Sequence, residues 1–335
     1  MSKAHRIEYI DIIKGIGIFL VVFGHVTTNQ EIYHFIYAFH MPLFFIISGM
    51  FLHDKPHFFK KQAKSLLLPY LSFGLLTYLY WFLIESRFRE LPAGETFFSQ
   101  FINLFIPTET QHCNVVLWFL PCLFLSCIAC NYINNRITSK KLKVVIAMGL
   151  ICSVGFIENG YPFYIGEAIH ALPYVMVGTI LDGGGNIPNI NQIITKYKNY
   201  AILIALMGLL TIHYSGITCN IQSNVYTPCY PISFTIGLLG FISIYVLAYR
   251  LKKNIILSWL GMNSLAIMLL HEPLKRIVIK LYAIFLNCPV DVVRESLINS
   301  LVITILTLLI LVPIVLFVNK YCPFLLGKSL QRKQT

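Results

Sequence analysis

The sequence predicts an all-α fold, a polytopic bundle of about ten transmembrane helices with both termini in the cytoplasm. Of its 335 residues, 57% are hydrophobic and only 12% are charged, whereas a soluble domain carries about 25% charged residues. A helix needs roughly 20 residues to span a bilayer. Apolar stretches close to that length recur along the whole chain. We therefore expect a single membrane domain over residues 1–335, with an embedded core to about residue 325 and a basic cytoplasmic tail at 326–335.

The first of these apolar stretches begins close to the N-terminus. Residues 1–28 lack a small-x-small cleavage site after the apolar stretch, so we interpret them as a retained helix rather than a cleaved signal peptide. Several expected spans are short, which is typical of tilted or broken helices near a site at membrane depth. The expected spans are residues 10–28, 38–53, 67–84, 115–133, 143–157, 167–181, 200–213, 229–249, 255–271 and 298–319.

The positive charge follows the expected topology and does not indicate a nucleic-acid partner. The formal net charge is +12, with 26 lysines and arginines. With the N-terminus inside, only six of these residues fall on the outer side, which is the positive-inside pattern. We therefore expect a multi-pass protein of the bacterial plasma membrane, with lipids as partners. The six outer residues are Arg87, Arg89, Lys275, Arg276, Lys280 and Arg294.

The nine cysteines show no metal-binding pattern, and no metal is expected. Cys127 and Cys130 form a C-x-x-C pair inside an apolar helix, where small apolar filling is their expected role. Cys219 and Cys229 share one expected outer loop, where a disulfide can form if the compartment is oxidising.

Three polar residues in the first expected span provide the strongest functional signal. Charged side chains within a span are costly and usually face a polar interior. On a helix Lys14 and His25 point within ~20° of each other, and Asp11 and His25 within ~40°, so the three share one stripe. Because Asp11 and His25 are roughly 21 Å apart along the axis, the charged residues lie near the cytoplasmic mouth and the imidazole lies deeper. Alternatively, Asp11 and Lys14 are interface anchors and His25 is a hydrogen-bonded histidine at the helix end.

One histidine and two lysines in the following segments are further candidates. His40 precedes Pro42, which suits the first turn of a second helix, and so lies on the same membrane side as His25. Histidine is suited to proton transfer near neutral pH. Lys61 and Lys64 are one helical turn apart at a cytoplasmic helix start, an arrangement that can hold phosphates. Plain positive-inside anchoring is the alternative role of both lysines.

A series of short motifs runs through the chain in a fixed order. Residues 9–49 contain Ile-Asp-x-x-Lys-Gly, Val-Val-Phe-Gly-His, Phe-His-Met-Pro-Leu-Phe-Phe and Ile-Ser-Gly. Leu-Leu-Leu-Pro-Tyr, Leu-Trp-Phe-Leu, Ala-Leu-Pro and Leu-Gly-Met-Asn-Ser-Leu follow, up to about residue 275. In these motifs the chain resembles acyltransferase family three of the membrane O-acyltransferases, and is most similar to its fucose 4-O-acetylase-like branch.

This resemblance implies a ten-helix domain that takes acyl groups from acyl-CoA in the cytoplasm and modifies carbohydrates. It places the family's basic-residue-x10-histidine motif on Lys14 and His25, and its R-x-x-R motif on Lys61 and Lys64. This sequence has lysine where arginine is frequent, and lysine lacks the bidentate fork. Phosphate binding tolerates that change better than a fixed carboxylate pair does, so the departure bears more on Lys14 than on His25.

We therefore expect an O-acyltransferase, with acetyl as the favoured group, that moves acetyl from cytoplasmic acetyl-CoA to a hydroxyl of a carbohydrate in O-antigen, capsule or a lipid-linked glycan. The acyl-CoA is a donor substrate, and we expect no permanently bound cofactor. Lys61 and Lys64 would hold its phosphates, and His25 would be a general base or a transient acyl carrier. Asp11 and Lys14 would line the donor path.

Five further residues are secondary candidates. His40 and His271 would be polar members of the cavity, although His271 ends an expected span and could simply face outer water. Trp118 is expected in a cavity wall or an aromatic belt. Glu158 and Glu167 lie near the outer side, where they could bind sugar hydroxyls.

A transporter or flippase of a lipid-linked sugar or small solute is the main rival interpretation. Polar residues within spans and short broken helices are equally typical of transporters. Inverted-repeat symmetry would favour that class, and the sequence shows no internal repeat.

Overall fold

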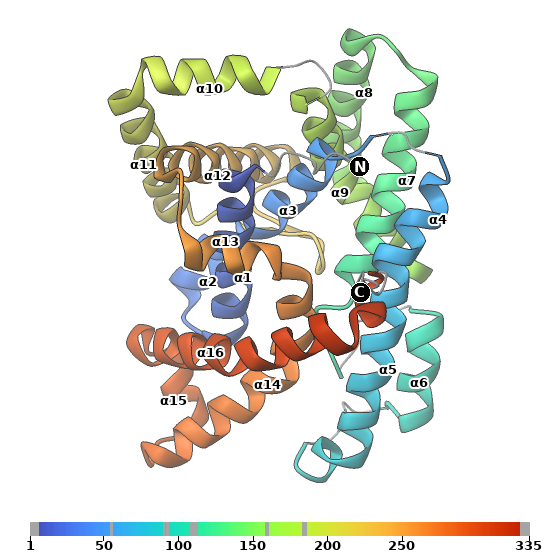
Figure 1. The fold of residues 1–335 in the computed structure, drawn as a ribbon, viewed down its shortest axis with the longest axis vertical. Coiled ribbons are helices and arrows are strands. Elements are labelled where there is room, and N and C mark those ends of the chain that lie inside the picture. Colours follow the sequence, from blue (N-terminus) through green and yellow to red (C-terminus); the bar gives the residue numbers. More distant parts are fainter. Residues whose placement is uncertain are drawn as a thin grey trace, which may run out of the picture.

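The computed structural model is almost entirely helical, as predicted (Figure 1). It describes residues 7–53, 56–89, 91, 94–107, 113–157, 161–182 and 186–328. The α-helices are α1 (Glu8–Val26), α2 (Gln30–Tyr37), α3 (His40–Met50), α4 (Phe58–Gln62), α5 (Leu68–Leu83), α6 (Phe97–Phe105), α7 (Phe119–Arg136), α8 (Lys140–Ser153), α9 (Ile165–Asp182), α10 (Asn186–Lys196), α11 (Lys198–Ser215), α12 (Tyr230–Leu251), α13 (Ile255–Met262), α14 (Ser264–Phe285), α15 (Val290–Glu295) and α16 (Leu297–Tyr321).

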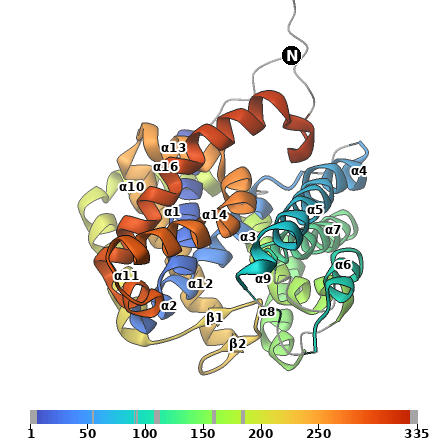
Figure 2. The same cartoon turned by 90° about the horizontal axis from the view of Figure 1, so that it is seen from below.

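Short elements connect several of these helices. A π-helix, Ala63–Leu67, joins α4 to α5 without a break in the chain direction. Strands β1 (Cys219–Asn220) and β2 (Val225–Tyr226) form an antiparallel hairpin between α11 and α12 (Figure 2). Single 3-10 turns are formed by Glu85–Arg87, Val154–Phe156, Pro162–Tyr164 and Pro323–Leu326.

Six helical segments of the described chain are long and apolar enough to cross a membrane, and two sharply bent pairs raise the number to eight if each is one span. The other two of the ten expected spans correspond to α7 and α8. Neither helix is both long enough and apolar enough to be counted. α7 ends in the polar run Asn-Asn-Arg, and α8 has 14 residues and begins with lysines. The chain is a multi-pass membrane protein; ten crossings and cytoplasmic termini stay predictions.

Helix α1 lies inside the bundle, where it packs against α13, α14, α12 and α3 (Figure 2). Ile13 on this helix is completely buried. The closest approach is to α13: a Cβ atom on Gly261 would lie 1.8 Å from the carbonyl oxygen of Asp11, and one on Gly15 would lie 2.0 Å from that of Leu257. Glycine at both positions lets the two backbones touch, which fixes α1 against α13.

The expected span at 255–271 is instead a broken pair that extends further. α13 and α14 meet at an angle of 83°, and α14 continues through Pro273 to Phe285. Proline is tolerated inside a membrane helix because neighbouring groups satisfy the freed carbonyl. Lys275, predicted in an outer loop, therefore lies within a helix and is only 7% exposed.

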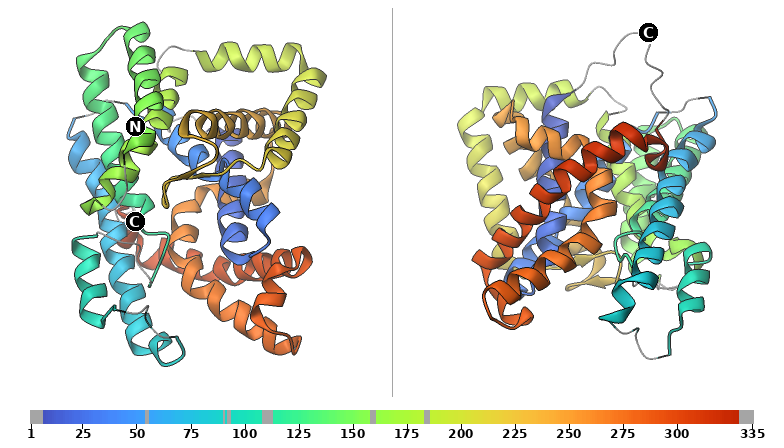
Figure 3. Two further views of the ribbon diagram at one scale, coloured as in Figure 1. Left: turned by 180° about the vertical axis from the view of Figure 1, so that it is seen from behind. Right: turned by 60° about the horizontal axis from the view of Figure 1, so that its bottom comes forward.

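The last helix closes one side of the bundle. α16 runs alongside α14 and also contacts α1 (Figure 3). The turn that follows α16 folds back on α5, and a Cβ atom on Gly327 (φ 67°) would meet the carbonyl of Lys64. Leu326, at the start of the expected tail, is buried. Residues 329–335 lie outside the described chain.

Candidate functional site

Two cavities follow one another along the same helices. The narrow cavity, about 280 Å³, is lined on α14 by Ser264, Leu265 and Met268. The wide cavity, about 970 Å³, is lined further along α14 by Glu272 and Lys275. The continuous segment 58–87 shows the same order, since its early residues line the narrow cavity and its late residues line the wide one. The two cavities are therefore stacked along the helix axes.

The narrow cavity connects the two motif positions of α1. Lys14 and His25 both line it, as their shared helical stripe predicts, together with Trp118. The ammonium group of Lys14 lies 5.5 Å from the ring centre of Phe51. Asp11 is partly buried and lies outside the cavity lining, where its backbone packs against α13. The cavity is otherwise mainly apolar, which suits a thin acyl chain.

The imidazole of His25 approaches the carboxylate of Glu272 where the narrow cavity ends. The Nδ1 atom of His25 is 3.9 Å from the Oε2 atom of Glu272. His25 lines the narrow cavity and Glu272 lines the wide one, so this pair forms part of the layer between them. The side chain of His25 is 18% exposed and that of Glu272 is 3% exposed. The imidazole is therefore the accessible member of the pair.

Two cations neutralise the buried carboxylate. Lys275 Nζ lies 3.1 Å from Glu272 Oε2, and Arg276 Nη2 donates to Glu272 Oε1 at 3.0 Å. Arg276 also bridges to Glu85 on the neighbouring segment, at 3.0 Å. Burying a carboxylate is costly unless such partners offset its desolvation. The arrangement holds a carboxylate in a fixed position beside His25.

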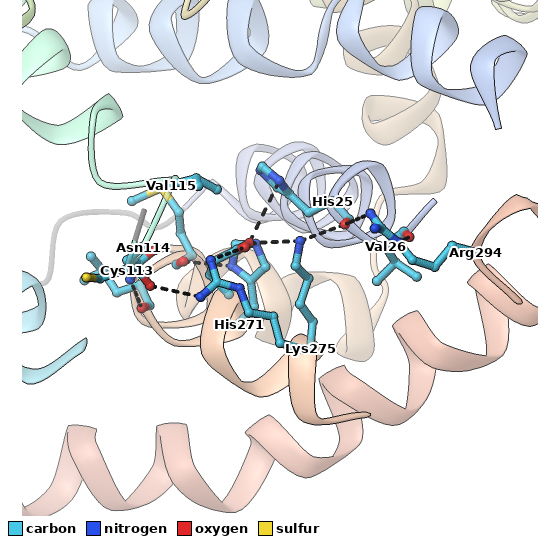
Figure 4. Close-up of polar contacts among 12 residues, drawn as sticks. His25, Val26, Cys113, Asn114, Val115, His271, Lys275 and Arg294 are labelled. Atoms are coloured by element: carbon cyan, nitrogen blue, oxygen red, sulfur yellow. Dashed lines mark hydrogen bonds and ion pairs between the residues drawn. The ribbon is translucent and has the colours of Figure 1, made fainter. Parts of the chain in front are cut away.

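Lys275 and a further cation, Arg294, hold the end of α1. Lys275 Nζ donates to the carbonyl oxygen of His25 at 2.7 Å (Figure 4). Arg294 donates from Nε to the carbonyl of Val26 at 2.8 Å and from Nη2 to that of His25 at 3.4 Å. The last carbonyls of a helix have no intrahelical partners and favour cations. These bonds fix the backbone from which the His25 side chain projects.

The two other candidate histidines are buried. His271 is completely buried rather than exposed to outer water, and its ring centre is 5.4 Å from that of His25. Its Nδ1–H donates to the carbonyls of Ile267 and Met268, which leaves Nε2 as an acceptor, 4.0 Å from the Glu272 carboxylate. His40 opens α3, and its Nδ1 bonds to the carbonyl of Ile36. His271 is thus part of the junction, whereas His40 lines neither cavity.

The two candidate phosphate-binding lysines lie next to the narrow cavity. Lys61 and Lys64 are exposed, and the adjacent Ser65 and Leu66 line the cavity. Lys64 belongs to the π-helix, a local widening that is frequent at functional sites. The structure therefore places both lysines on the segment whose next residues, Ser65 and Leu66, line the cavity.

The candidate acceptor residues are not gathered in one place. Trp118 is 5% exposed and lines the narrow cavity, which agrees with its expected place in a cavity wall. Glu167 is 6% exposed and lies outside both cavities. His170, on the same helix as Glu167, donates from Nε2 to the carbonyls of Val154 and Ile157 and has a structural role. Glu158 lies outside the described residues.

Sequence reasoning missed the partner of His25. Glu272 and Lys275 follow His271, the last residue of the expected span 255–271, so the sequence places them in an outer loop. Pro273 is the misleading signal, since proline usually marks the end of a helix. If the expected helix is extended past Pro273, Glu272 and Lys275 become charges within a span. The cost of such charges then identifies both residues as functional candidates.

The described cysteines are all free thiols, including Cys219 and Cys229. Cys219 is buried in β1 beside the hydroxyl of Tyr174 at 3.2 Å, and burial raises the pKa of its thiol to about 12. Cys229 is exposed. Among the described residues no group of three His, Cys, Asp or Glu side chains could hold a metal ion.

A family model described as an acyltransferase domain matches residues 7–319, nearly the whole chain. The chain belongs to acyltransferase family three. This family-three acyltransferase matches no curated protein and no solved structure. Family membership establishes a membrane acyltransferase, and the stacked cavities of this family-three acyltransferase locate the residues on which a specific reaction can be proposed.

Proposed function

We propose that this family-three acyltransferase moves acetyl from cytoplasmic acetyl-CoA to a hydroxyl of a cell-surface or lipid-linked carbohydrate, in the bacterial plasma membrane. The observation that best supports this proposal is the narrow cavity that joins Lys14 to His25 and ends beside the wide cavity. A thioester donor and a sugar acceptor need separate approaches that meet at one base. The pair of His25 and Glu272 lies where the two cavities adjoin.

The donor enters from the side of Lys14. Its phosphates are anionic and stay outside the hydrocarbon, where Lys61 and Lys64 hold them as point charges. The long, thin pantetheine arm then threads through the apolar narrow cavity toward His25. Lys14 lines this path. Asp11, outside the cavity lining, acts by fixing the helix rather than by touching the donor.

The chemical step uses the neutral imidazole of His25 as general base. Its Nδ1 faces Glu272, so Nε2 accepts the proton from the acceptor hydroxyl as the oxygen attacks the thioester carbonyl carbon. The C–S bond then breaks, and the departing CoA sulfur takes the proton back from Nε2. Glu272 stabilises the transient imidazolium, in the manner of the carboxylate of a catalytic triad.

Labelled acetyl-CoA tests this proposal. The purified protein in nanodiscs is incubated with acetyl-labelled CoA and a membrane glycolipid extract, and label in the glycan is measured. The wild type should transfer label, and His25→Ala should lower the rate by about 10²–10⁴-fold, the usual contribution of a general base. If the intact protein leaves the glycan unlabelled, the transporter interpretation is favoured instead. Near-normal transfer by His25→Ala would exclude His25 as the base.

A second assay separates the two roles left open for His25. If His25 carries the acetyl group covalently, the protein exchanges free labelled CoA into acetyl-CoA without any acceptor. Direct attack, which we propose, requires the acceptor and gives no such exchange.

A double variant tests the proposed phosphate contacts. Replacing Lys61 and Lys64 together by alanine should mainly raise the acetyl-CoA concentration needed for half-maximal rate.

A further inference from the structure

The wide cavity has more positive than negative side chains in its lining. Its cations are Arg89, Lys275, Arg276, Lys280 and Arg294, and its carboxylates are Glu85 and Glu272. Both carboxylates are already used within the protein, since Arg276 contacts both and Lys275 contacts Glu272. The lining therefore retains positive charge after the internal ion pairs have formed.

Two of the five cations have no carboxylate partner in the described part of the chain. Lys280 is exposed on α14 and pairs with no carboxylate of the described residues. Arg294 is half-buried and donates to two backbone carbonyls, which do not neutralise its charge. A cavity with uncompensated lysine and arginine side chains is suited to an anionic ligand.

The remainder of the wide cavity is apolar and open at its edge. Ile84, Phe88, Ile277 and Leu281 line it, and all four are exposed large hydrophobic residues. On a membrane protein such side chains face lipid, so a ligand can keep an acyl or isoprenoid chain in the bilayer while its head enters the cavity. A free, fully hydrophilic anion would gain nothing from this edge.

We propose that the wide cavity binds the acceptor as a sugar carried on a lipid phosphate or pyrophosphate, with the anionic group held by Lys280 and Arg294. This inference rests on the proposed function, and it adds the acceptor's chemical class and the residues that recognise it. The sugar lies between the phosphate and the junction, so that one hydroxyl reaches His25. A carboxylate on the sugar itself is the other source of the same charge.

A comparison of three acceptors in neutral nanodiscs tests the inference. Transfer of labelled acetyl is compared for a polyprenyl-pyrophosphate-linked sugar, the same sugar on a neutral alkyl chain, and a uronic acid on that chain. The pyrophosphate acceptor should have a KM lower by about tenfold or more, as one charge-assisted contact implies. Equal KM values for charged and neutral acceptors would overturn the inference, and preference for the uronic acid would overturn the phosphate assignment.

Lys280→Ala is the matched variant, because its side chain is exposed and its loss should not disturb folding. It should raise the KM for the pyrophosphate acceptor by about tenfold while leaving kcat and the KM for acetyl-CoA unchanged. Lys140→Ala, at another exposed lysine, on α8 and outside both cavities, should change nothing. An unchanged acceptor KM in Lys280→Ala would overturn the proposed contact.

A binding assay without donor distinguishes failure here from failure of the proposed function. Polyprenyl phosphate is titrated into the protein in neutral nanodiscs and followed by intrinsic fluorescence. Saturable binding that weakens in Lys280→Ala supports the anion site even if no acetyl is transferred. Competition by phosphatidylglycerol at equal concentration would show ordinary phospholipid binding and overturn the inference, while acetyl transfer to neutral sugars would still support the function.

Discussion

His25 Nδ1 and Glu272 Oε2 lie 3.9 Å apart, although the two residues come from the first helix and the fourteenth. Only Glu272 is anchored by two cations, so the carboxylate is fixed and the imidazole retains freedom to approach it. Such a pair gives the imidazole a preferred orientation and stabilises its protonated form. The relationship makes Glu272 a positioning residue for the proposed base.

Replacing the carboxylate tests that role. Glu272→Gln should lower kcat by about 10²-fold or more while leaving the KM for acetyl-CoA nearly unchanged, because the donor path is intact. It should also cost about 3–5 kcal/mol of stability, since Lys275 and Arg276 lose a buried partner. Initial rates and thermal unfolding in detergent measure both effects. Glu295→Gln, at an exposed position, is the control, and wild-type kcat in Glu272→Gln would rule the role out.

The contact between α1 and α13 should tolerate no side chain. In Gly261→Ala the new methyl group would lie 1.8 Å from a backbone oxygen, which cannot rotate away. We expect a loss of about 1–3 kcal/mol or more, measured as a lower unfolding temperature, because overpacking forces backbone shifts. Gly149→Ala on α8 provides the control, because its added carbon would have no atom within 4 Å beyond its chain neighbours and the backbone of its own helix. Equal unfolding temperatures for the two variants would contradict the close approach.

Filling the narrow cavity should impair use of the donor. Ser48 lines this cavity and bonds to the carbonyl of Phe44, one helical turn earlier. Ser48→Phe places a ring in the proposed acyl path, and we expect a rise of about tenfold in the KM for acetyl-CoA or loss of transfer. Ser153→Phe replaces a serine with the same kind of bond on an exposed helix end. If both variants use acetyl-CoA alike, the donor does not take this route.

The thiol of Cys219 should react slowly and with a strong dependence on pH. Burial raises its pKa to about 12, and the thiolate is the reactive form. Its alkylation rate should therefore climb with pH, by about tenfold per unit, up to that value. Maleimide labelling followed by mass spectrometry measures this, with the exposed Cys229 as the faster reference. Rapid labelling of Cys219 at pH 7 would contradict its burial. A disulfide between Cys219 and Cys229 would appear in the mass spectrum as a pair of linked peptides.

The parts of the site that the sequence predicted are local in the chain. Lys14 and His25 belong to one helix, so helical periodicity alone places them on one stripe, and the narrow cavity lies along it. The all-α membrane fold could be predicted as well, because composition and the lengths of apolar stretches are also local properties of the chain. Glu272 could not be paired with His25 in this way, because their approach depends on the 83° break before α14 and on the glycine contact of α13 with α1. Neither tertiary feature has a periodic signature.

The layer that separates the two cavities has an electrical consequence. A membrane that stores a proton gradient cannot tolerate a water-filled path through one of its enzymes. In this layer, charges of both signs pair with each other and with backbone carbonyls. We therefore expect the side chains that hold the imidazole in place also to resist proton leakage, and a variant that loosens them should leak protons before it unfolds.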